Sequence, residues 1–276
     1  MDQPDFSGIR RGYVDTRWGQ LHFRETGSGP NPALVCLHAT AFSGQTFLPI
    51  MKPLGATRRV LALDTPGYGE SDGPPHEVSF EAYATVIAEA TRRLVPESPV
   101  DFLGYHTGAL VATEIAGHHS ELVRRLVLIG IPYFSGEEKE QWRAKLVHKT
   151  TLTEQFDQFR GRWEYFVTNR SAGLSLSRGF DSFVDELKVY PREWWAHRAL
   201  FDYEPEAQLA DIHSDTLVIN TTSPLSDAST RAAAAIPGAQ VLSIPELKGA
   251  IFDFGTERLS FEIEQFLSPH PKSVAS

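Results

Sequence analysis

The sequence predicts an α/β protein built on a mostly parallel, doubly wound sheet with an inserted helical segment. Short apolar runs alternate with longer helical patterns, and such runs are typical of strands covered on both faces of a parallel sheet. A long stretch between two of these runs shows only helical patterns, which indicates an insertion. We expect the strands at residues 34–37, 60–63, 100–103, 126–129, 217–219 and 241–244.

Local sequence features predict the start of one helix and a hairpin at the edge of the sheet. Ser79 is a good N-cap for a helix that runs to about Leu94 before the next strand. Residues 12–29 alternate in polarity and contain a Gly-Ser-Gly turn, which predicts a hairpin on the sheet edge. The alternation of strands and helices then favours right-handed crossovers between neighbouring parallel strands.

The insertion is predicted to form a helical cap. Residues 133–205 are rich in aromatic side chains and would divide the core into residues 1–132 and 206–276. Helices inserted over the strand ends of a parallel sheet are a natural lid for a pocket. Most of these aromatic residues should pack the cap itself, and we consider Tyr133 and Trp163 as pocket candidates.

Composition restricts the classes of partner. The chain has 276 residues and a formal net charge of −9, which disfavours nucleic acid and anionic membranes as partners and favours solubility. The partner we expect is a small-molecule substrate. No apolar run approaches the roughly 18 residues that span a bilayer, and the polar opening lacks a signal core, so we expect a cytoplasmic monomer or homodimer. The single cysteine, Cys36, lies in an apolar run and is predicted to be a buried structural thiol.

Four motifs occur in order along the chain. They are a His38-Ala39-Thr40 turn after a strand, the loop from Asp64 to Asp72, the sequence Gly104-Tyr105-His106-Thr107-Gly108, and a closing pattern from Ile244 to Leu267. Together they resemble the α/β-hydrolase superfamily. The resemblance implies that Gly104–Gly108 is the sharp strand-to-helix turn called the nucleophile elbow. It also implies that Ala39, Thr40 and Thr107 surround an oxyanion hole, with His38 and Tyr105 beside the pocket.

The resemblance does not extend to the usual catalytic triad. The central elbow residue, normally serine, is His106. The position of the family histidine falls on Gly249, and the position of the family acid falls on Ser223 or Pro224. The nearest carboxylate to the acid position in the sequence is Asp227.

His106 is therefore the main candidate for chemistry. The elbow aims its central side chain into the pocket, and the helix N-terminus behind it favours a neutral imidazole that can act as a base or nucleophile. With an oxyanion hole, this arrangement suits ester hydrolysis, or C–C cleavage or elimination, on a small and partly aromatic carbonyl compound. Groups considered for orienting the imidazole are Asp227, Glu246, Lys248, His148 and His197.

Two alternatives remain open at this point. A protein lacking the triad can be an inactive, ligand-binding relative of a hydrolase, or a hydrolase with its nucleophile relocated to Ser43, Thr107 or Ser223. We expect no metal, because no two histidines are spaced with a carboxylate as a recognisable site. We also expect no cofactor, because the chain has no phosphate loop and no G-x-G-x-x-G after a strand.

Overall fold

The predicted strands form one sheet in the computed structural model, which describes residues 6–97 and 99–268. The strand order is β1-β2-β4-β3-β5-β6-β7-β8, and all neighbours from β4 to β8 are parallel. The predicted hairpin is also confirmed, because β1 and β2 pair antiparallel at one edge. The strands are β1 (Arg10–Thr16), β2 (Gly19–Thr26), β3 (Asn31–Leu37), β4 (Arg58–Leu63), β5 (Val100–Tyr105), β6 (Val123–Ile129), β7 (Asp215–Thr222) and β8 (Gln240–Lys248).

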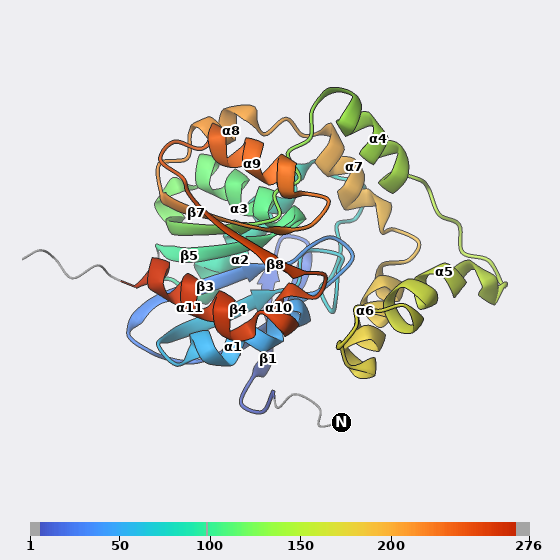
Figure 1. The fold of residues 1–276 in the computed structure, drawn as a ribbon, viewed down its shortest axis with the longest axis horizontal. Coiled ribbons are helices and arrows are strands. Elements are labelled where there is room, and N and C mark those ends of the chain that lie inside the picture. Colours follow the sequence, from blue (N-terminus) through green and yellow to red (C-terminus); the bar gives the residue numbers. More distant parts are fainter. Residues whose placement is uncertain (1–5, 98, 269–276) are drawn as a thin grey trace, which may run out of the picture.

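Helices cover both faces of this sheet (Figure 1). In β3 to β7, residues on opposite faces of the sheet belong to two separate apolar clusters, as the period of two requires. One cluster joins the sheet to α2 (Phe80–Leu94), α3 (Thr107–His118), α8 (Glu206–Ala210) and α9 (Ser226–Ala235). The other joins it to α1 (Leu48–Gly55), α10 (Ile251–Phe254) and α11 (Thr256–Leu267) and includes the buried Cys36. Two 3₁₀ turns, η1 (Gly44–Phe47) and η2 (Ser120–Leu122), connect these elements.

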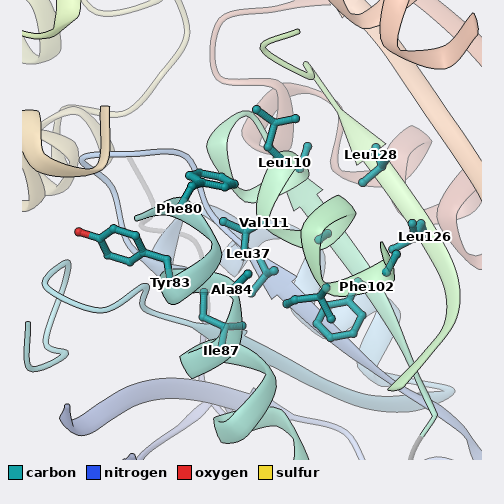
Figure 2. Close-up of a cluster of buried hydrophobic side chains, with 14 of the residues drawn as sticks. Leu37, Phe80, Tyr83, Ala84, Ile87, Phe102, Leu110, Val111, Leu126 and Leu128 are labelled. Carbon is teal, nitrogen blue, oxygen red and sulfur yellow. The ribbon is translucent and has the colours of Figure 1, made fainter. Parts of the chain in front are cut away.

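Helix α2 begins and ends where the sequence predicts. The Ser79 hydroxyl accepts a hydrogen bond from the backbone N–H of Ala82, and the helix runs to Leu94. Figure 2 shows Phe80 and Ile87 of this helix in the same buried cluster as Leu37 and Phe102 of the sheet. This packing fixes α2 beside α3, the helix that follows the elbow.

Residues 133–205, here called the helical insertion, lie between β6 and β7 at one end of the sheet (Figure 1). Polar contacts hold α6 of this segment on the core. The Ser43 hydroxyl donates to Asp185 (2.7 Å), the Gln45 amide donates to the Asp181 carbonyl (3.2 Å), and Arg178 pairs with Asp253 (2.8 Å). The insertion consists of α4 (Gly136–Leu146), η3 (Phe156–Phe159), α5 (Arg160–Trp163), η4 (Glu164–Thr168), α6 (Leu176–Val189) and α7 (Trp194–Asp202).

The loop after β4 is organised by one buried carboxylate, that of Asp64. It pairs with the ring of His22 (2.8 Å) and with Arg24 (3.1 Å), and it accepts the backbone N–H groups of Gly44 and Glu70. Burial raises the pKa of Asp64, but the His22 hydrogen bond and the Arg24 charge outweigh that effect and lower it to about 2. Within the described residues no helix is long and apolar enough to cross a membrane. The tail after Ser268 lies outside the described residues.

Replacing Asp64 with alanine should lower the free energy of unfolding by about 3–5 kcal/mol, because it leaves Arg24 buried without its partner. Chemical denaturation of the variant and the wild type measures this. Asp15→Ala is the control, since Asp15 is exposed, and should cost under about 0.5 kcal/mol. Because the folded pKa of Asp64 is lowered, its contribution should be present above pH 3.8 and fade as pH falls toward 2. An equal loss in both variants would contradict this account.

Candidate active site

A tight turn joins β5 to α3 and presents His106. The backbone of His106 has φ 51° and ψ −116°, a strained conformation for a residue with a side chain. The flanking glycines make the turn possible, because an added Cβ would lie 2.4 Å from the Ala109 Cα at Gly104 and 2.0 Å from the Leu37 carbonyl at Gly108. The G-x-H-x-G pattern thus reflects backbone contacts that only glycine allows.

Backbone strain is concentrated near this turn. Among the described residues other than glycine, His106 and Ala41 are the two with φ in the left-handed region, at 51° and 70°. Ala41 lies in the loop after β3, beside the Thr40 that contacts Thr107 of the elbow. Strained residues persist where surrounding structure holds them in place, and they often cluster at functional sites.

The His106 imidazole lies between an aromatic ring and a glycine. Its ring centroid is 3.9 Å from that of Tyr105, with an angle of 34° between the planes. An added Cβ on Gly130, at the end of β6, would come within 2.5 Å of the imidazole Cδ2, so the absence of a side chain there makes room for the ring. Withdrawal from water lowers the pKa of His106 to about 4, which keeps the imidazole neutral at pH 7.

A cavity of about 420 Å³ opens beside His106, between the strand ends and the helical insertion. It brings His106 together with Ser223 and Gly249, the two positions that correspond to the missing acid and histidine. Its walls are otherwise aromatic and hydroxyl-bearing residues with a few charged groups. The lining residues are Phe42, Thr46, Tyr105, His106, Tyr165, Phe166, Asn169, Arg170, Ser171, Leu174, Arg178, Ser182, Thr221, Thr222, Ser223, Pro224, Gly249, Ala250, Ile251, Phe252 and Asp253.

Ser171 of the insertion occupies the space next to Gly249. A Cβ built on Gly249 would lie 2.5 Å from the Ser171 hydroxyl oxygen, and the glycine has φ 70°. The insertion therefore fills space that a side chain at position 249 would need. Sequence reasoning missed Ser171, Arg170 and Arg178, because it weighed the aromatic residues of the insertion and no motif marks its polar ones.

The predicted oxyanion residues Ala39, Thr40 and Thr107 lie beside the elbow, but they do not line the large cavity. The Thr107 hydroxyl oxygen accepts the Thr40 backbone N–H (3.3 Å) and the Thr40 hydroxyl (2.8 Å). The Thr40 amide is therefore already engaged. The Thr107 N–H opens the first turn of α3 and has no acceptor within that helix, so it is the stronger anion donor of the pair.

His38 has a structural role. Its buried ring contacts the Ala39 carbonyl through Nδ1 (2.7 Å) and accepts the Thr65 backbone N–H at Nε2 (2.8 Å). The Nδ1 nitrogen is then the protonated one. His38, Thr40 and Thr107 line a separate void of only about 10 Å³, so His38 lies outside the large cavity.

Several other predicted site residues lie away from the cavity. Asp227, Glu246 and Lys248 are exposed and absent from its lining, since they point to solvent from α9 and β8, and they cannot orient His106 here. The ring of Trp163 packs edge-on against that of Phe183, with 5.3 Å between the ring centroids. Tyr133, His148 and His197 are also absent from the lining, whereas Tyr105 lines it. No described residue hydrogen-bonds to the His106 ring, and the described residues contain no cluster suited to a metal ion.

The chain is similar to known proteins in sequence and in fold. A family model described as the alpha/beta hydrolase fold matches residues 32–153, which include the elbow. A hydrolase from Pseudomonas aeruginosa superposes with a TM-score of 0.78 at 20% identity, covering 95% of this chain and 99% of that one. The chain has the α/β-hydrolase fold. An enol-lactonase from Burkholderia xenovorans gives 0.74 at 19% identity, covering 94% and 100%.

Curated relatives of this α/β-hydrolase-fold chain are named as hydrolases. A pimeloyl-[acyl-carrier protein] methyl ester esterase from Vibrio atlanticus is 31% identical over 155 residues, which cover 55% of this chain and 58% of that protein. A bifunctional epoxide hydrolase from Sus scrofa is 35% identical over 136 residues, which cover 47% and 23%. The chain thus matches less than two thirds of the length of these relatives. These partial matches show that the chain is similar to hydrolases over about half of its length, and the superposition shows that it shares their fold.

Gly130→Ala should destabilise the protein more than Gly238→Ala. Both glycines have a left-handed φ, at 66° and 69°, but a Cβ at Gly130 meets the His106 ring whereas one at Gly238 meets nothing within 4 Å. The second variant should cost about 1–2 kcal/mol, as left-handed backbone does, and the first should cost more. Denaturation measures both. In a His106→Ala background, Gly130→Ala should destabilise the protein no more than Gly238→Ala does. If Gly130→Ala still costs more there, the contact with the His106 ring is not the cause.

The His106 imidazole should stay neutral from about pH 8 down to about pH 5, whereas an ordinary histidine titrates near 6.5. An NMR titration of the ring protons, assigned with His106→Ala, measures this, and we expect a midpoint of about 4. The unfolded chain binds this proton at a higher pH than the folded protein does. As the pH is lowered from about 6.5 to 4, the free energy of unfolding should therefore decrease. A midpoint near 6.5 would contradict the environment described.

Proposed function

We propose that the protein is a hydrolase that cleaves esters of small, partly aromatic carbonyl compounds, with His106 as the catalytic base or nucleophile. The observation that carries this proposal is a neutral imidazole held at the elbow beside a cavity of about 420 Å³. That volume lies within the range of small-molecule sites. The esterase and hydrolase relatives support the same reaction class.

As a base, His106 accepts a proton from water while the water oxygen bonds to the ester carbonyl carbon. The carbonyl oxygen becomes an anion, and the donor we propose for it is the Thr107 N–H, which follows His106 at the start of α3. The C–O bond to the leaving group then breaks, and the alkoxide takes the proton back from the imidazolium. A carboxylic acid and an alcohol are formed, and His106 returns to its neutral state.

As a nucleophile, the unprotonated imidazole nitrogen bonds to the carbonyl carbon, the C–O bond to the leaving group breaks, and the alkoxide takes the proton of the other ring nitrogen to leave as the alcohol. Water then adds to the carbonyl carbon of the reactive acyl-imidazole, the C–N bond breaks, and the ring takes a proton from that water, which gives the carboxylic acid and neutral His106. A pKa of about 4 makes His106 a weak base. The nucleophilic route depends less on base strength than the general-base route does. The same base position would also serve C–C cleavage or elimination in a β-keto compound.

Two observations favour a second function, ligand binding without turnover. The Ser171 hydroxyl occupies the space beside Gly249, and the Thr40 amide is engaged by Thr107. Both features remove parts of the usual machinery. A relocated nucleophile is less well supported, because Ser43 is buried and bonded to Asp185 and Thr107 is bonded to Thr40; of the three candidates only Ser223 lines the cavity.

His106→Ala should lower kcat/KM on aryl acetates by about a hundredfold or more, the usual contribution of a general base. Turnover of a panel of aryl acetates and β-keto compounds measures this. His213→Ala is the matched control, because His213 is exposed and absent from the cavity lining, and it should keep wild-type rates. Unchanged turnover in His106→Ala would refute the role of His106. Labelling of Ser223 by a serine-reactive probe would favour the relocated nucleophile.

A further inference from the structure

The charge of the cavity is opposite to that of the chain. The protein carries a formal net charge of −9, yet the charged side chains among the cavity-lining residues are two arginines, Arg170 and Arg178, and one carboxylate, Asp253. His106 is neutral at pH 7. The cavity wall therefore has one excess positive charge, which attracts anions within an otherwise acidic protein.

The Arg178 charge is compensated. This buried guanidinium donates Nε–H to Asp253 at 2.8 Å and a second N–H to the other carboxylate oxygen at 3.3 Å. It also donates to the Gln45 backbone carbonyl at 3.3 Å. Its charge and most of its donors are used to hold α6 against the core.

The Arg170 charge is not compensated. This side chain is partly buried and donates to two backbone carbonyls, those of Leu174 and Val167, each at 2.8 Å. It forms no ion pair with any residue in the part of the chain that the structure describes. A guanidinium has five N–H donors, so three remain for a ligand. The backbone bonds hold the group in place without a counterion, and such pre-organisation lowers the cost of binding an anion.

We infer that the substrate carries a carboxylate and that Arg170 is the residue that selects it. This inference rests on the proposed function and names its substrate class. A planar guanidinium matches a carboxylate in two parallel hydrogen bonds, and one excess positive charge suits a monoanion. The aromatic rings of Phe166 and Phe252 in the same cavity suit an aryl body, so the preferred ester is a carboxylated aryl ester.

Binding can be tested without relying on turnover. The probes are para-acetylbenzoate and para-acetylbenzamide, two ketones of the same shape that differ in charge and cannot be hydrolysed as esters. Calorimetry with the full chain should show the benzoate binding at least about tenfold more tightly than the benzamide. The same preference should appear in kcat/KM for para-acetoxybenzoate over para-acetoxybenzamide.

Arg170→Gln should bring the ratio of the two dissociation constants close to one by weakening only the benzoate. Arg160→Gln is the matched control, because it removes the same charge from the same insertion, but Arg160 is exposed and pairs with Asp157. It should leave the ratio unchanged. Arg170→Lys keeps the charge but not the planar guanidinium, and it should keep part of the preference for the benzoate. This variant controls for a folding defect in Arg170→Gln.

The outcomes separate the two proposals. Equal affinity of the wild type for the benzoate and the benzamide overturns the inference, whatever the activity. A ratio that falls equally in Arg170→Gln and Arg160→Gln also overturns it, because the effect would then be one of overall charge. If neither acetoxy compound is hydrolysed while an Arg170-dependent preference remains, hydrolysis fails as the function and anion selection by Arg170 stands.

Discussion

The close approach of three backbone segments at the elbow is the constraint on which the site depends. Strand β5 lies in the middle of the sheet between β3 and β6, and α3 follows it after a single residue. The segments meet so closely that a methyl group at Gly104 or Gly108 would overlap backbone atoms. The strain at His106 is therefore stabilised by the packing of the whole core, and the direction of its side chain is fixed by the backbone rather than by a hydrogen bond.

This explains how an imidazole can lie in the site without a polar partner. A fully buried histidine loses free energy unless its nitrogens are hydrogen-bonded, but His106 is only half-buried and lines the cavity. His106 instead packs against the Tyr105 ring and the space left by Gly130, and it avoids the larger cost of a buried charge by staying neutral. The surroundings of His106 differ from those of a triad in having an aromatic contact in place of an orienting acid.

The sequence predicts the fold far better than the site. The apolar runs, the Ser79 cap and the edge hairpin depend on local periodicity and turn chemistry, and each lies in the expected element. Asp227, Glu246 and Lys248 were chosen for nearness in the sequence, which says nothing of whether a side chain at a strand end points to solvent. Ser171 and Arg170 reach the cavity through tertiary packing of the insertion, for which no spacing rule exists. Trp163 packs against another ring, as most aromatic residues of helical segments do.

Gly249 and Ser171 show that several positions of the site depend on one another. A histidine placed at position 249 would keep a left-handed φ of 70°, and the Ser171 hydroxyl, 2.5 Å from its Cβ, would have to rotate away. The elbow residue would still be His106, and no carboxylate of β7 or the β7–α9 loop lines the cavity. The three triad positions would have to change together. The cavity therefore presents His106 with hydroxyl and guanidinium groups of the insertion, in place of the residues of a triad.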